Sequence, residues 1–161
     1  MTAEQLRAGH GFVAGGEALA LGVVVFVMGT LLVLSGWSLV DGKLAVEASA
    51  REAARSVIES PVAVLADPVT GHQLADTTAR ATMVAHRGPD DSPDTTWRFI
   101  RTQVSGAIAR CAPITATVTI DVDTVRMPLL GGGLGTVTLT GVHTERIEPY
   151  RGGLPTGSFQ C

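Results

Sequence analysis

The chain has 161 residues, a formal net charge of −3 and a mean hydropathy of +0.30, and only 17% of its residues are charged. Its apolar character is concentrated in the run from Ala18 to Val40, which contains no charged residue. This distribution argues against a cytosolic enzyme with one uniform core. The arginines are dispersed singly and there is one lysine, so the chain lacks the basic stripe that would make nucleic acid a partner.

Residues 18–40 predict a transmembrane helix. A bilayer core of about 30 Å needs about 20 apolar residues in helical form, which this run supplies. It is longer than the apolar region of a cleaved secretory signal and continues into a helical pattern, so we expect it to be retained as an anchor. Trp37 near its end fits either the membrane interface or ordinary packing.

The orientation of this span is not decided by composition. Arg7 is the only Lys or Arg in the short N-terminal flank, whereas Lys43, Arg51 and Arg55 follow the span. This distribution of basic residues opposes a cytoplasmic N-terminus under the positive-inside bias. A long downstream domain translocates largely regardless of charge, so a cytoplasmic N-terminus with an external domain remains allowed.

Helical periodicity continues beyond the span to about residue 60. Apolar residues at spacings of three and four predict one buried face. They are Val46, Ala50, Ala53 and Val57. Opposite charges at i,i+4 on the other face predict two ion pairs, Glu47 with Arg51 and Arg55 with Glu59.

A second, shorter helix is predicted over residues 71–88. Pro61 and Pro68 interrupt the helical pattern before it. Its predicted apolar side consists of Leu74, Ala81, Val84 and Ala85. Residues 88–96 have the composition of an exposed loop.

From Trp97 onward the hydrophobic period changes to two. Residues 114–122 and 136–147 read as half-buried strands, and residues 96–104 as a weaker third strand. The alternation of apolar and polar residues shifts by one position at Gly141, which predicts a β-bulge there. Residues 128–135 read as a hairpin connection. The predicted fold is therefore α+β, with a long N-terminal helix, a second short helix and a small antiparallel sheet of about three strands.

No catalytic, metal or cofactor site is visible in the sequence. The glycines at 131–135 lack the lysine and hydroxyl residue of a phosphate loop. No acidic or Cys residue stands at metal-ligand spacing from His72, His86 or His143. A solvated loop explains the acidic run of Asp90, Asp91 and Asp94 better than calcium binding does. We therefore expect a protein that is not an enzyme and needs no cofactor.

The two cysteines, Cys111 and Cys161, lie far apart and lack metal-ligand spacing. In an exported domain they could form a disulfide that ties the C-terminal tail to the body; the alternative is two unpaired thiols.

Glu17 immediately precedes the uncharged run, where a carboxylate faces a desolvation cost. It could lie at headgroup level and interact favourably with the helix dipole. Alternatively, it needs a cationic partner, such as the N-terminal amine of a neighbouring subunit.

Gly11 and Glu17 before the apolar helix, Trp37 near the end of the span, and the following VDGKLAVEASAREAARSVIE together resemble the TadE-like proteins of tight adherence (Tad) pilus systems, especially actinobacterial ones. The resemblance covers residues 11–60 best. RCAPITATVTIDVDTVRMPLLGG and HTERIEPYRGGLP are similar to the C-terminal part of that family, more weakly.

The resemblance implies a minor pilin or pseudopilin of a machine related to type IV pili. A prepilin peptidase would cut the leader after Gly11 and make Phe12 the new N-terminus. Glu17 would match the family's acidic residue, although it stands at the sixth mature position and the family usually has it at the fifth. The implied organisation is a leader 1–11, a mature N-terminus 12–17, the span 18–40, a helical continuation 41–60 and an extracytoplasmic α+β domain 61–161.

The implied partners are the membrane, other pilins or pseudopilins, the Tad assembly platform and the prepilin peptidase. A different class of function stays open at this point. The chain could be a single-pass membrane-anchored binding module that recognises an envelope component and never enters a filament.

Overall fold

The computed structural model describes residues 3–89, 96–123, 126–127, 132–133, 135–157 and 159–161. The chain forms two compact units, Met1–Ser38 and Leu39–Cys161. In chain order the elements are α1 (Ala3–Glu59), α2 (Val62–Ala66), α3 (Pro68–Arg87), β1 (Trp97–Gly106), β2 (Pro113–Asp123), β3 (Arg126–Met127), β4 (Gly132–Gly133) and β5 (Thr136–Arg146).

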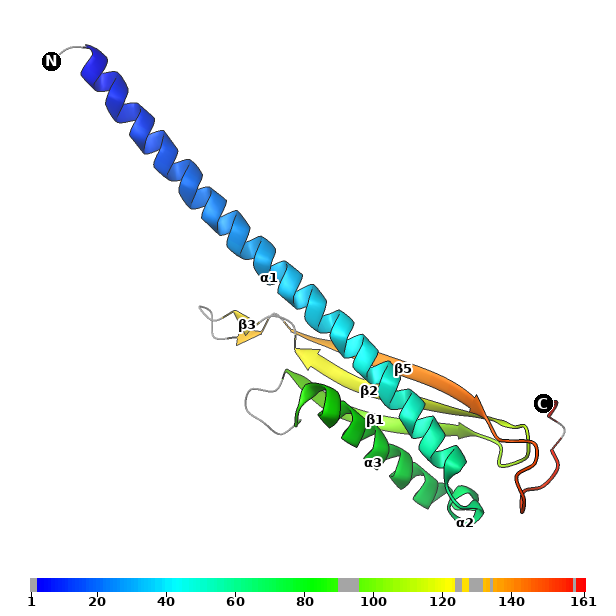
Figure 1. The fold of residues 1–161 in the computed structure, drawn as a ribbon. Helices are drawn as coiled ribbons and strands as arrows, with labels where there is room; N and C mark the ends of the chain where they lie inside the picture. Colours follow the sequence, from blue (N-terminus) through cyan, green and yellow to red (C-terminus); the bar gives the residue numbers. More distant parts are fainter. Residues whose placement is uncertain (1–2, 90–95, 124–125, 128–131, 134, 158) are drawn as a thin grey trace. The chain divides into compact units, whose positions relative to one another are not determined.

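The first unit consists of the first part of α1, and the second combines the rest of that helix with α2, α3 and the strands. β1, β2 and β5 form an antiparallel sheet in the order β1-β2-β5, and β3 pairs with β4 in a separate two-stranded ribbon. In the second unit the helices cover one face of the sheet (Figure 1). The predicted α+β fold is therefore confirmed, and its long N-terminal helix packed on a small antiparallel sheet is a pilin-like layout.

The core of the second unit lies between the end of α1 and the inner face of the sheet. The predicted apolar stripe is confirmed, since Val46, Ala50 and Ala53 are fully buried and Val57 is 3% exposed. β2 alternates strictly, and its inward side chains are all buried. They are Ile114, Ala116, Val118, Ile120 and Val122.

Two glycines allow α1 to approach the sheet closely. A Cβ on Gly141 would lie 2.4 Å from the carbonyl oxygen of Val46, and one on Gly42 would lie 3.0 Å from Leu139 Cδ1.

The β-bulge predicted at Gly141 is wrong, because β2 and β5 pair without a register shift through this residue. The alternation of apolar and polar residues is interrupted here because the inward position at 141 has no side chain, while the apolar Val142 is exposed.

The irregularity of the sheet lies instead in β1. The register with β2 shifts between Phe99 and Arg101, so Ile100 is the extra residue and is 44% exposed. Phe99 and Thr102 both remain buried on the inner face. The insertion preserves the inward alternation on each side of the bulge.

The second predicted helix begins three residues earlier than expected, at Pro68 of α3. Asp67 caps it by accepting hydrogen bonds from the Thr70 hydroxyl and from the Val69 amide. These two bonds, the one from Thr70 foremost, hold the pKa of Asp67 below its usual value.

The predicted apolar side of this helix is wrong. Residues spaced four apart turn towards the core instead: Gly71, Ala75, Ala79 and Met83. Val84 is 37% exposed and both Ala81 and Ala85 are exposed. Gly71, Ala75 and Ala79 are small and let the helix axis lie close to the sheet, and Met83 is the one large side chain on this core face.

One of the two predicted ion pairs is formed. Arg55 Nε lies 2.7 Å from Glu59 Oε1, and this bond and charge raise the pKa of Arg55. Glu47 pairs with Lys43, at 3.0 Å, instead of with Arg51. Lys43 is favoured because its ammonium also donates to the carbonyl of Thr140 on β5.

Cys111 and Cys161 form a disulfide that, within the second unit, ties the C-terminal tail to the residues just before β2. Their Cα atoms lie 5.0 Å apart, within the range that a bridge requires. The closed loop spans 50 residues, and in the chain-entropy account such a crosslink stabilises the fold by about 4 kcal/mol.

We expect Gly141→Ala to lower the free energy of unfolding of the second unit by about 2 kcal/mol, because the new methyl group meets the α1 backbone. Urea denaturation of the full chain in detergent, followed by the fluorescence of the buried Trp97, measures this change. Gly152→Ala is the matched control, since a Cβ there meets nothing within 4 Å. Equal midpoints for the two variants would contradict the close approach of α1 and β5.

Candidate functional site

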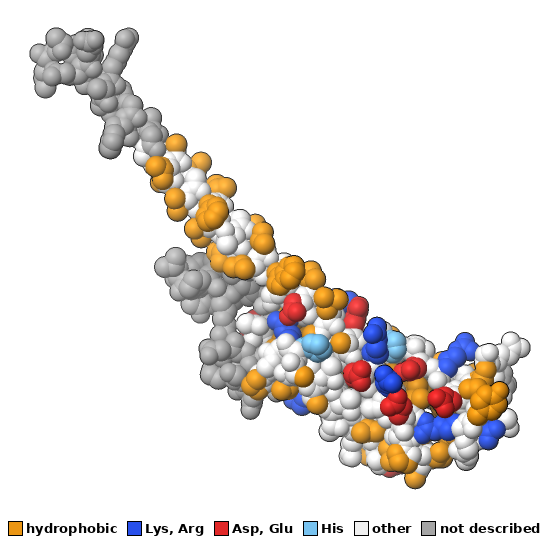
Figure 2. All heavy atoms as spheres, in the orientation of Figure 1, with side chains coloured by type: hydrophobic (Ala, Val, Ile, Leu, Met, Phe, Trp, Pro, Cys, Tyr) orange, Lys and Arg blue, Asp and Glu red, His pale blue; other side chains and the backbone are white. Residues whose placement is uncertain are grey.

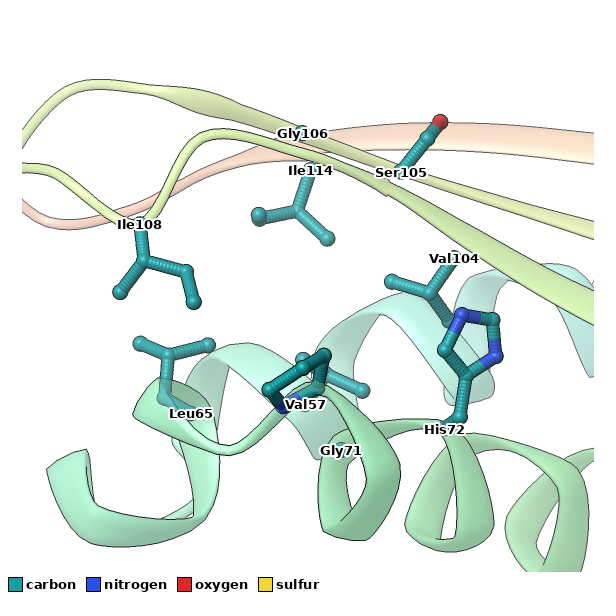
Figure 3. A pocket seen from close by; sticks show the side chains of 10 residues that line it. Val57, Leu65, Gly71, His72, Val104, Ser105, Gly106, Ile108 and Ile114 are labelled. Carbon is teal, nitrogen blue, oxygen red and sulfur yellow. The ribbon is translucent and has the colours of Figure 1, made fainter.

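A small cavity lies in the second unit between the helices and the end of the sheet. Its volume is about 90 Å³, and Figure 3 shows Leu65 and Ile108 facing each other across it. His72 is its one titratable lining residue, and its ring points towards Val104. Ser105 also lines the cavity, but its hydroxyl points away from the other lining side chains in Figure 3.

Of the three histidines considered in the sequence, His72 and His86 lie on α3 and His143 lies on β5. Within the described ranges, no group of three or more His, Cys, Asp or Glu side chains is placed to hold a metal ion. Asp90, Asp91 and Asp94 lie outside the described residues, as does Gly131, whereas Gly132 and Gly133 form β4.

The most unusual surface of the molecule is the part of α1 in the first unit. α1 is long and apolar enough to cross a membrane, and its most apolar stretch has a mean hydropathy of 2.6 with no buried residue. Phe26 is 73% exposed, Leu32 70% and Trp37 74%. Figure 2 shows hydrophobic side chains over this part of the helix. Water is a poor solvent for such a surface, which must be covered by lipid or by other protein.

Two hydroxyl side chains within this segment are bonded to the backbone of their own helix. Thr30 Oγ1 donates to the carbonyl of Phe26 at 2.9 Å, and Ser35 Oγ donates to the carbonyl of Leu31 at 2.6 Å. Hydroxyl groups bonded to the preceding turn of their own helix can enter an apolar environment without a lost hydrogen bond.

Glycines recur along one side of this segment. Gly22, Gly29 and Gly36 follow each other at intervals of two helical turns, and a Cβ on any of them would meet nothing within 4 Å. A shallow apolar groove runs beside Gly29, between Phe26 and Val33. The glycine interval was visible in the sequence as a strict repeat, but only the structure shows that the space beside it is open.

The residues expected to direct processing and assembly all lie on α1. Gly11 and Phe12 are within its helical backbone, and the side chain of Phe12 is not among those described. The Glu17 side chain is exposed, in the same helical segment as the glycines.

The disulfide bears on the compartment of the second unit. Such bonds persist in oxidising environments, so the Cys111–Cys161 bridge fits a domain outside the cytoplasm. Among the described residues, one long apolar helix near the N-terminus fits a membrane anchor or a signal.

Comparison of the chain with protein-family models, with curated proteins and with solved structures finds no match.

Proposed function

We propose that this protein is a non-enzymatic, single-pass minor pilin or pseudopilin of a Tad-type machine. Its N-terminus lies in the cytoplasm, its span in the membrane and its α+β domain outside. The observation that carries the proposal is the exposed apolar helix with open glycines, which continues directly into the core of a small pilin-like domain.

In this proposal α1 works by exchanging one apolar environment for another. Lipid covers it while the subunit waits in the membrane, and helices of other subunits cover it after assembly. Association in an apolar medium gains little from the hydrophobic effect, so it depends on close packing. Gly22, Gly29 and Gly36 provide a side on which a neighbouring backbone can approach closely.

Glu17 supplies the electrostatic part of the same mechanism. A prepilin peptidase would release Phe12 as a charged amine at the membrane surface. In the low dielectric of a helix bundle, Glu17 and the amine of a neighbouring subunit are each costly alone and are stabilised as a pair. The pairing would favour subunits in one axial register. The resemblance to TadE-like proteins supports this assignment through Gly11, Phe12 and Glu17.

Processing is tested by the intact mass of the protein purified from its native host. We expect a chain that begins at Phe12, and Gly11→Leu should leave the full-length chain in the membrane because the peptidase recognises a small residue before the cut. A wild-type protein of full length would instead favour the membrane-anchored binding module.

The packing role of the glycines is tested by Gly29→Leu. We expect this variant to reach the membrane at the wild-type level but to be lost from assembled filaments, because the leucine fills the side on which helices approach. Membrane fractionation and immunodetection in sheared filaments measure the two quantities. Val27→Leu adds apolar volume to the opposite side and should assemble normally. Equal incorporation of both variants would show that the glycine side is not a packing surface.

The role of Glu17 is tested by Glu17→Ala. Membrane insertion should persist, whereas the amount of assembled filament should fall at least tenfold, since about 1.4 kcal/mol of pairing already corresponds to a factor of ten. Glu52→Ala is the control, because it removes the same charge from an exposed position of α1 in the second unit. Normal piliation in the Glu17 variant would exclude the pairing.

A further inference from the structure

The outer face of the β1-β2-β5 sheet, opposite α1 and α3, carries a regular pattern of polar side chains. In one row across the sheet, Arg101, Thr119 and Thr140 are register partners. The last row of the pattern joins Ser105 to Thr115 and Thr144 in the same way. We call the surface made by these two rows and the one between them the polar sheet face.

The row between them consists of Gln103, Thr117 and Val142, which is 58% exposed. The remaining β1 and β5 members of the polar sheet face are also exposed, and its β2 threonines are half-buried. Thr115 Oγ1 and Thr144 Oγ1 lie 2.8 Å apart, so hydroxyl groups of neighbouring strands share a hydrogen bond. Neighbouring strands lie about 4.8 Å apart, so the face offers closely spaced donors and acceptors around one apolar side chain.

The bulge in β1 determines the charge of this face. Because Ile100 is the extra residue, both Arg98 and Arg101 project outward although they are three residues apart. Arg98 lies opposite Asp121, whose carboxylate accepts a hydrogen bond of 2.6 Å from Thr138. Arg101 lies opposite Thr119 instead, and the three rows of the polar sheet face contain no acidic residue. The polar sheet face therefore carries one formal charge, the positive charge of Arg101, in a chain of net charge −3.

We propose that the polar sheet face binds an acidic polysaccharide. Arg101 pairs with an acid group of the polymer, because a guanidinium matches carboxylate and phosphate in a bidentate fork. The threonines and Gln103 exchange hydrogen bonds with sugar hydroxyls, and Val142 contacts the apolar side of a ring. The complementary charge and the many uncharged donors favour a polyhydroxylated anion over a lipid surface, which would need a basic cluster with large apolar side chains to insert. This binding does not depend on whether α1 enters a filament.

The test uses the full chain in detergent micelles and three polymers on a biosensor: polygalacturonate, phosphomannan and neutral dextran. We expect binding to at least one of the acidic polymers and at least tenfold weaker binding to dextran. The two acidic polymers distinguish a carboxylate from a phosphate as the recognised group. Failure to bind either one overturns the proposal, and so does tighter binding to vesicles of anionic phospholipid than to both polymers.

Variants locate the binding on the polar sheet face. Arg101→Gln should weaken binding about tenfold, as expected for a lost hydrogen bond between charged groups. Arg51→Gln removes the same charge from an exposed position of α1 and should change binding by less than twofold. Thr117→Val keeps the side-chain shape and should weaken binding severalfold through its hydroxyl alone. An equal loss in both arginine variants would show non-specific attraction and overturn the assignment.

Discussion

The contact between α1 and β5 is the constraint on which the second unit depends. At this contact a helix backbone lies directly on a strand, because Gly141 leaves no side chain beneath Val46 and Glu47. The next turns of α1 then bury Ala50, Ala53 and Val57 against the sheet. An alanine-lined helix contributes little apolar volume per residue, so the core can exclude water only if helix and sheet are close together.

The same helix therefore has two unlike environments along its length. Beyond Leu39 its inward side is buried by the chain's own sheet, whereas its apolar residues from Leu19 to Trp37 have no such cover. A helix that ended at the membrane could be exchanged for another anchor without affecting the domain. Here the apolar segment and the domain core are parts of one element, which fits a role in which the helix itself makes the functional contacts.

Sequence patterns predicted the parts of the fold in which side-chain chemistry determines the packing. The α1 stripe and the alternation of β2 are of this kind, because apolar residues there recur at the period of their element. The prediction failed where packing uses the absence of a side chain. Gly71 and Ala75 form the core side of α3 although larger apolar residues lie elsewhere on it, and Gly141 was mistaken for a bulge. The bulge at Ile100 was not predicted, because it lies in the strand whose alternation of apolar and polar residues is weakest.

The glycines of α1 and β5 form two groups, which differ in whether a neighbouring element lies close beside them. A Cβ on Gly42 or Gly141 would come within about 3 Å of a neighbouring element, so each of these glycines marks an approach that the chain completes by itself. Gly22 and Gly29 meet nothing within 4 Å, although a glycine in a helix costs about 1 kcal/mol relative to alanine. Inside the second unit that cost is offset by the close packing of α1 on the sheet. In the exposed segment no contact among the described residues offsets it, which supports the proposed packing of this segment against other helices.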